Sequence, residues 1–82
     1  EAWNNLGIVR GELGDRRGAV EALEHALNLV PHYADAHYNL AEALSSIGEF
    51  GRARRHWSAY LRFDPNSRWA DQARRRLRSP RG

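Results

Sequence analysis

Four histidines are the side chains of this sequence that could most directly support chemistry, because an imidazole binds metal ions and exchanges protons near neutral pH. A helical metal site needs two histidines one turn apart, and His25, His32, His37 and His56 contain no such pair and no HExxH motif. His32 and His37 flank an expected turn, which leaves a shared metal ion between them as the less favoured alternative. We therefore expect solvent-exposed histidines, no metal site and no cofactor.

Glycines and serine hydroxyls are the other groups that could mark an active site. Gly7, Gly11, Gly14 and Gly18 are closely spaced, but none follows an expected strand and no Gly-Lys-Ser/Thr sequence completes a phosphate-binding loop. The serines, at positions 45, 46, 58, 67 and 79, lack a base-and-acid set that could activate a nucleophile. The sequence therefore predicts that the protein is not an enzyme.

Composition limits the chain to one small domain. Its 82 residues include no cysteine, no methionine and no long apolar run, so we expect no disulfide and no membrane-spanning helix. The missing methionine and signal peptide suggest an excised domain of a longer, cytoplasmic protein. Residues 1–41 hold three arginines and six acidic residues, whereas residues 42–82 hold ten arginines and four acidic residues. The second half could therefore contact an anionic partner.

The sequence matches itself when it is shifted by 34 residues, which indicates an internal repeat. The matched residue types suit their positions, because glycines recur where a turn is needed and prolines where a helix must stop. The seven matched pairs are Ala2 with Ala36, Asn5 with Asn39, Leu6 with Leu40, Gly14 with Gly48, Ala19 with Ala53, Leu27 with Leu61, and Pro31 with Pro65.

Each repeat predicts two antiparallel helices joined by a short turn. Gly14 and Gly48 end the first helix of each unit, Pro31 and Pro65 end the second, and Ser67 caps a fifth helix. The expected helices cover about residues 1–13, 17–29, 34–47, 51–63 and 67–78, followed by a frayed tail. The first repeat then covers residues 1–33, the second 34–67, and a closing element 68–82.

The two ends of such a stack should differ in how they are covered. The fifth helix would cover the last repeat, whereas the first repeat has no cover in this sequence. We therefore expect an exposed apolar end near Trp3 and Leu6, where an upstream repeat or a second copy of the chain could dock. Between the two ends, we expect Trp57, Leu40 and Leu61 to form the centre of the core.

The residues at these spacings resemble the tetratricopeptide repeat family, in its bacterial type. The first unit carries the signature residues Trp3, Leu6, Gly7, Ala19, Ala26 and Pro31, and the second carries Leu40, Ala53, Trp57 and Pro65. The second unit departs from the signature at His37, Ala41 and Tyr60. The resemblance implies an all-α fold of five helices, in which helix-turn-helix repeats stack as a short right-handed solenoid.

The same resemblance implies that the protein binds a peptide or a partner helix in a concave groove. In this family the first helix of each unit lines the groove, with Ile8, Tyr38 and Trp69 here as apolar anchors. The implied groove residues are Asn4, Asn5, Ile8, Glu12, Asp35, Tyr38, Asn39, Glu42, Trp69 and Gln72, with Ser46 and Arg76 as additional candidates.

Two other functions stay open, and one is excluded. The arginine-rich second half could contact nucleic acid or another polyanion, although no nucleic-acid-binding motif is present, and the uncovered first repeat could form a homodimer. Capture of a chaperone's terminal carboxylate is excluded because that clamp uses lysine and arginine. The matching positions here hold Asn4, Ile8, Asn39, Trp69 and Ala73.

Overall fold

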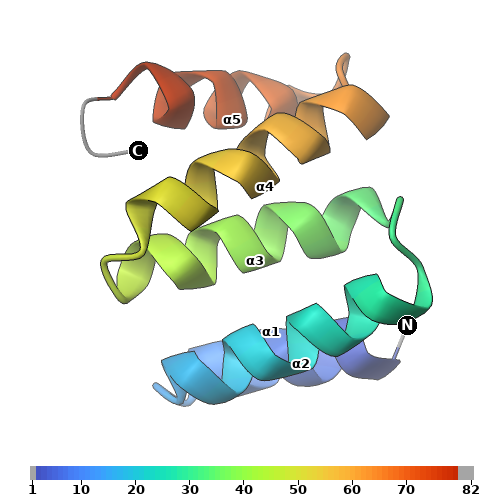
Figure 1. The fold of residues 1–82 in the computed structure, drawn as a ribbon, viewed down its shortest axis with the longest axis vertical. Helices are drawn as coiled ribbons and strands as arrows, with labels where there is room; N and C mark the ends of the chain where they lie inside the picture. The colour runs from blue at the N-terminus through green and yellow to red at the C-terminus, as the bar shows by residue number, and fades with distance from the viewer. Residues whose placement is uncertain (1, 80–82) are drawn as a thin grey trace.

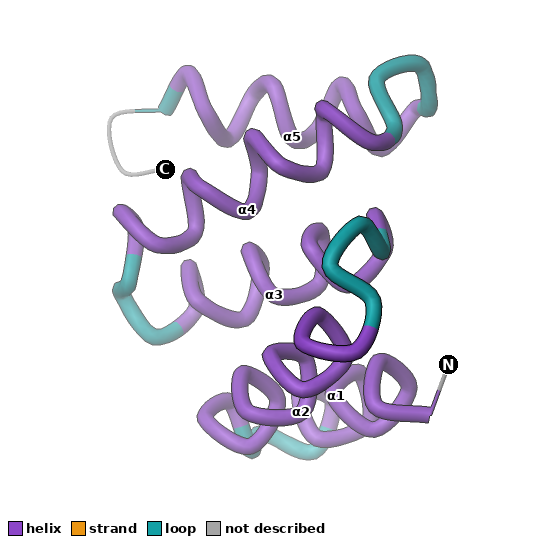
Figure 2. The backbone as a smooth tube through the Cα atoms, turned by 45° about the vertical axis from the view of Figure 1, so that its right-hand side comes forward, coloured by secondary structure: helices purple, strands orange, loops and turns teal. Residues whose placement is uncertain are grey.

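A computed structural model describes residues 2–79, and within that range every regular element is an α-helix. The helices are α1 (Ala2–Glu12), α2 (Arg16–Leu29), α3 (Ala34–Ser46), α4 (Phe50–Phe63) and α5 (Arg68–Arg78), joined by short loops (Figure 1, Figure 2). The five expected helices are therefore confirmed, with ends that differ by one residue or less. The predicted start at residue 1 and the predicted frayed tail over residues 80–82 lie outside the described residues.

Four of the helix boundaries have a local chemical cause. Gly14 and Gly48 follow α1 and α3 with φ angles of 87° and 82°, the left-handed conformation that glycine adopts without a Cβ penalty. Asp15 caps α2 by accepting a hydrogen bond from the Gly18 backbone N–H at 3.0 Å, and Ser67 caps α5 in the same way. These four residues mark the boundaries between α1 and α2, between α3 and α4, and before α5.

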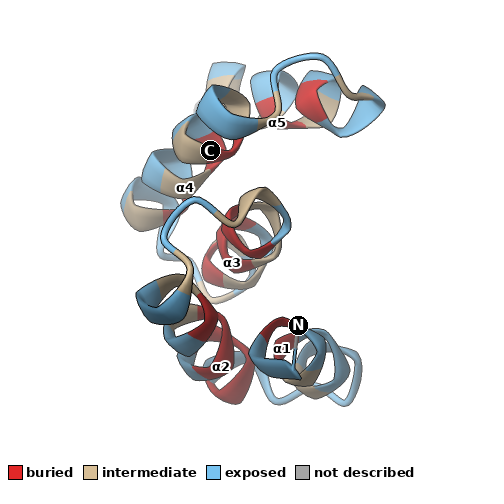
Figure 3. Cartoon of the chain, turned by 90° about the vertical axis from the view of Figure 1, so that its right-hand side faces the viewer, coloured by how far each residue is buried: buried red, intermediate tan, exposed pale blue. Residues whose placement is uncertain are grey.

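The helices stack in chain order, and consecutive helices run antiparallel (Figure 1). Each helix packs against its neighbours in the sequence, and α1 also contacts α3. In a view roughly along the helix axes, α1, α3 and α5 lie along one side of the stack and α2 and α4 along the other (Figure 3). No helix within residues 2–79 is long and apolar enough to cross a membrane.

The core is centred between α3 and α4. Trp57 and Leu40 are almost fully buried, as expected, together with Leu23 and Leu44. The expectation for Leu61 is wrong, because this residue is only partly buried and Tyr60 occupies the central position instead. Tyr60 lies one turn after Trp57, where its ring contacts Tyr38 of α3 and its hydroxyl lies 2.7 Å from the Ser67 hydroxyl.

The first repeat is open on its outer side. Trp3 and Val9 are substantially exposed, Leu13 is 80% exposed, and Leu6 is only partly buried. Helices α1 and α2 pack closely at Gly7, which has no side chain. A Cβ atom added at Gly7 would lie 2.6 Å from the Leu23 Cγ atom. An exposed apolar end is therefore present where the repeat pattern predicts it.

Candidate functional site

A groove of about 470 Å³ lies between α1, α3 and the start of α5. We call this the inner groove. Its lining residues are Asn4, Asn5, Ile8, Tyr33, Asp35, Tyr38, Asn39, Glu42, Tyr60 and Trp69. Eight of the ten residues expected from the family resemblance are among them. The other two lie next to it, Glu12 in a hollow beside α2 and Gln72 in a hollow beside α5.

Two residues that line the inner groove, Tyr33 and Tyr60, were not predicted from the sequence. Tyr33 precedes α3 and Tyr60 belongs to α4, so neither lies on a helix that the family resemblance assigns to the groove. Tyr33 enters because the loop between the repeats folds back toward Asn4, and Tyr60 enters because its long side chain reaches past α3. Of the two additional candidates, Ser46 lies in the hollow beside α2, and Arg76 places its guanidinium over the Trp57 ring.

Two asparagine side chains form a hydrogen-bonded floor in the inner groove. The Asn39 Nδ2 atom donates to the Asn4 Oδ1 atom at 3.0 Å, and the Asn4 Nδ2 atom approaches the Tyr33 hydroxyl at 3.4 Å. Asn4 is only 5% exposed, so it belongs to the floor rather than to the accessible wall on which the sequence placed it. The floor ties α1 to α3, because its amides satisfy one another where water is largely excluded.

Aromatic rings form the part of the inner groove nearest to α5. Tyr38 makes edge-to-face contacts with Trp57, Tyr60 and Trp69, at centroid distances of 4.9, 5.1 and 5.8 Å. Trp69 is 52% exposed, and the Arg68 guanidinium lies 5.0 Å from the centre of its ring. Burial raises the pKa of both Tyr38 and Tyr60, so the two phenols are neutral at physiological pH.

Charges of opposite sign border the inner groove on its two sides. Asp35 and Glu42 are exposed on α3, one turn before and one turn after Tyr38. On α5, Arg68 and Arg75 lie around Trp69, in the hollow next to the groove. The groove thus has an acidic wall on α3 and a basic rim on α5.

A family model described as a tetratricopeptide repeat matches residues 12–77. The chain belongs to the tetratricopeptide repeat family. Repeats of this family mediate protein–protein interaction, which fits a stack of helices with a concave side.

The chain is also similar to three proteins of other organisms. Protein FlbA of Caulobacter vibrioides is 33% identical over 60 residues, which is 73% of this chain and 10% of FlbA. A TPR repeat-containing protein of Rhizobium etli is 28% identical over 88% of the chain, and human tetratricopeptide repeat protein 6 is 26% identical over 84%. The chain spans only 35% of the Rhizobium protein's length and 13% of the human protein's.

Two histidines that contact each other, His37 and His56, lie outside the inner groove. His37 stands where the family has its tryptophan, and it is 8% exposed, so the expectation of a solvated histidine is wrong here. Its ring contacts His56 on α4 and stacks on Phe63, with centroid distances of 5.2 and 5.7 Å. Within residues 2–79, no group of three histidine or acidic side chains could hold a metal ion.

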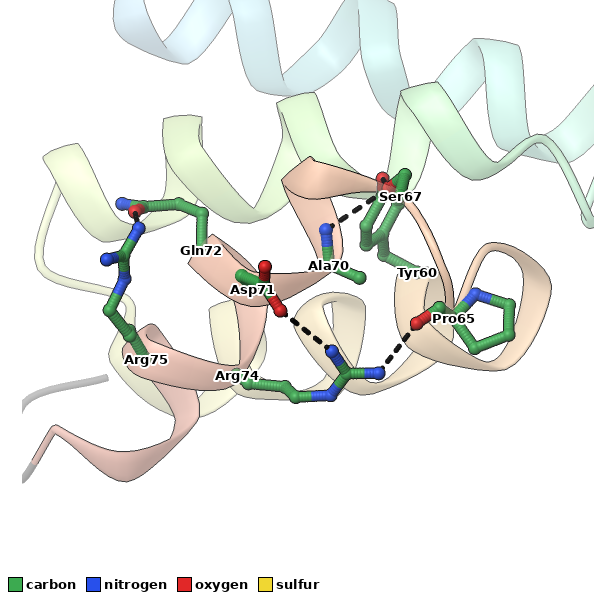
Figure 4. Close-up of polar contacts among 8 residues, drawn as sticks. All are labelled: Tyr60, Pro65, Ser67, Ala70, Asp71, Gln72, Arg74 and Arg75. Atoms are coloured by element: carbon green, nitrogen blue, oxygen red, sulfur yellow. Dashed lines mark hydrogen bonds and ion pairs between the residues drawn. The ribbon is translucent and has the colours of Figure 1, made fainter.

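Many arginines of the second half are engaged in contacts within the chain. The Arg52 side chain pairs with Glu24 of α2, and Arg74 pairs with Asp71 and donates to the Pro65 carbonyl oxygen (Figure 4). Other arginines donate to the Leu77 carbonyl oxygen and to the Gln72 amide oxygen. These arginines are therefore less available to an anionic partner than the sequence alone suggests.

Proposed function

We propose that this tetratricopeptide domain binds a short segment of another protein in the inner groove and performs no catalysis. The observation that carries the proposal is the composition of the groove, which combines apolar anchors with amides. Ile8, Tyr38 and Trp69 present apolar surface, and Asn5 and Asn39 present amide groups beside it. A peptide needs both, because its side chains require apolar contacts and its backbone requires hydrogen-bonding partners.

The Asn39 side chain is oriented for such a backbone contact. Its Nδ2 atom already donates to Asn4, which fixes the amide plane and leaves the Oδ1 atom as an acceptor with no hydrogen-bond partner among residues 2–79. An accepting oxygen held in place can receive a backbone N–H of the bound segment without a large loss of side-chain entropy. Asn5, on α1, is exposed and can act in the same way from the opposite wall.

The size of the groove limits what it can hold. A volume of about 470 Å³ suits a few side chains and is too small to enclose a folded partner. The proposed ligand is therefore a short extended segment or one face of a helix. Its contact area would be small, so we expect binding in the micromolar range rather than tighter.

Chemical-shift mapping on the 82-residue chain tests this function. Peptides selected against the chain from a random library would be titrated into labelled protein. The largest shifts are expected for backbone amides of α1, α3 and α5, and Trp69→Ala should weaken binding several-fold. Phe50→Ala, a matched aromatic truncation at the start of α4, should leave affinity unchanged. Shifts centred on α2 and α4 would contradict the proposal.

Self-association is a second candidate, and the open outer side of the first repeat favours it. Val9 on α1 and Leu13, directly after this helix, are exposed, and Trp3 is exposed beside His25. A second copy of the chain could cover this surface. Light scattering after size-exclusion chromatography would detect a dimer, and Leu13→Glu should dissociate it. A monomer at all concentrations would exclude this candidate and leave the inner groove as the binding surface.

A further inference from the structure

The acidic wall of the inner groove is formed by two exposed carboxylates of α3. Asp35 and Glu42 are exposed, and within residues 2–79 neither forms an ion pair, in contrast to Glu24 and Asp71. Both nevertheless line the same groove as Tyr38 and Trp69. Two unpaired negative charges beside aromatic rings form an environment that favours a cation, because a ring face attracts positive charge and a carboxylate pairs with it.

The spacing of the two carboxylates along α3 is fixed by the helix. Asp35 and Glu42 are seven residues apart and therefore lie on one face, about 10 Å apart along the helix axis. Tyr38 and Asn39 lie between them on the same face. A single basic side chain cannot pair with both carboxylates at this separation, so a complementary ligand needs two.

The conformation of the bound segment decides which two residues can pair. In a polyproline-II conformation, residues three apart lie on the same side of the chain and about 9 Å from each other. In a β-strand, side chains on one side are about 7 or 13 Å apart, and neither spacing matches the wall. Of these two extended conformations, a polyproline-II segment with basic residues at positions i and i+3 matches the spacing on α3 better.

We propose that the inner groove selects a segment of a partner protein that carries two basic side chains three residues apart, one facing Asp35 and the other Glu42. This inference rests on the proposed function of the inner groove and adds the chemistry of its ligand. The methylene stems of the basic side chains would pack on Tyr38 and on the exposed part of Trp69. The amide of Asn39, between the two carboxylates, would bind the backbone of the segment.

The charges around this site restrict how the segment lies. Arg68 and Arg75 border Trp69 from α5, and Arg16 borders the hollow beside α2. Arg75 donates to Gln72, Arg68 lies over the Trp69 ring, and Arg16 approaches the Ser46 carbonyl oxygen at 3.5 Å. Basic side chains of the ligand would be repelled from these positions, so they are directed to the α3 wall between them.

Fluorescence anisotropy with designed peptides tests the inference. The probe is a labelled nine-residue peptide of alanine and proline, with blocked ends and arginines at its fourth and seventh positions. One comparison peptide carries glutamates at those positions, and another carries its arginines at the fourth and fifth positions. On the 82-residue chain, the first peptide should bind roughly two- to fivefold more tightly than the one with adjacent arginines, and the glutamate peptide most weakly.

Variants of the wall provide an independent measurement. Asp35→Asn and Glu42→Gln should each weaken binding of the first peptide by roughly two- to fivefold, because each removes one partly solvated charge pair. Glu21→Gln is the matched control, since Glu21 is an exposed carboxylate on α2 outside the groove and the change in net charge is the same. Binding of the first peptide to this control should equal binding to the parent chain.

The outcomes separate this inference from the proposed function. Equal affinity for the arginine and glutamate peptides, an equal effect of Glu21→Gln, or no binding of the first peptide would overturn the selection of basic residues. Equal affinity for the two arginine peptides would overturn the spacing. The proposed function would still hold after each of these results if peptides from the random library changed the chemical shifts of the α1, α3 and α5 amides.

Discussion

His37 and His56 face each other across the contact between α3 and α4, with their Nδ1 atoms 3.0 Å apart. The Nε2 atom of His37 lies 2.8 Å from the Pro31 carbonyl oxygen, and since a carbonyl only accepts, this Nε2 atom carries a hydrogen. A neutral His37 ring therefore accepts at Nδ1, and His56 donates from its own Nδ1 atom. This hydrogen bond joins α3 to α4 through the two imidazole rings.

Acid should destabilise the fold through His56. Burial, reinforced by His37, Arg52 and Arg55, lowers the pKa of His56 from 6.5 to about 4. Between these two values the unfolded chain binds more protons than the folded chain, so the free energy of unfolding falls as the pH falls from 6.5 to about 4. The loss would be about 3 kcal/mol for a fully buried ring, and partial exposure reduces it to about 1–2 kcal/mol.

Urea unfolding at a series of pH values measures this loss. Carboxylates also titrate in this range, so the control is a His56→Gln variant, which keeps every carboxylate and removes the titrating ring. The parent chain should lose about 1–2 kcal/mol more than the variant between neutral pH and pH 4. Parallel curves for the two proteins would show that His56 does not contribute to acid sensitivity.

Replacing Trp57 should remove most of the stability of the domain. The side chain is fully buried among Tyr38, Leu40 and Tyr60, and Trp57→Ala would leave a large cavity there. We expect a loss of about 3–5 kcal/mol in the free energy of unfolding, measured by urea titration with circular dichroism. Phe50→Ala, on the same helix but exposed, should lose about 1 kcal/mol or less. Equal losses would contradict the assigned core.

Two glycines in adjacent turns should respond oppositely to alanine. Gly48 has a φ of 82° and open space around it, so Gly48→Ala introduces backbone strain without a steric clash. We expect a loss of about 1–2 kcal/mol. Gly51 lies in the first turn of α4, also in open space but without a positive φ, so Gly51→Ala should stabilise by up to about 1 kcal/mol. Melting temperatures that shift in the same direction would contradict this account.

Removing the cap of α5 should loosen the cover of the second repeat. Ser67 Oγ accepts a hydrogen bond from the Ala70 backbone N–H at 3.1 Å and lies 2.7 Å from the Tyr60 hydroxyl (Figure 4). Ser67→Ala should lower the free energy of unfolding by about 1 kcal/mol. The loss stays moderate because Tyr60 keeps its hydrogen bond to Asp64.

The matched control for this cap is Ser58→Ala, on the exposed side of α4, which should change stability by less than about 0.5 kcal/mol. Hydrogen exchange would locate the effect of Ser67→Ala, since amides of α5 should exchange faster while those of α1 and α2 stay protected. Uniform acceleration along the chain would mean that α5 unfolds only together with the rest of the domain.

The sequence by itself determined the helices and their order. Glycine at positions 14 and 48, proline at 31 and 65, and the caps Asp15 and Ser67 act through their own backbone conformation and neighbouring N–H groups. Such effects need no distant partner, so the helix ends could be predicted within one residue. The groove residues of α1 and α3, by contrast, were implied by the family resemblance rather than by the spacing alone.

Only the tertiary structure decided which side chains meet. The pairing of His37 with His56, the floor of Asn4 and Asn39, and the burial of Tyr60 in place of Leu61 join residues from different helices. Each of these contacts depends on the angle and offset at which two helices pack, and shifting a helix by one residue would replace the contact with another. Those offsets are set by the fit of many side chains at once, which no single spacing in the sequence records.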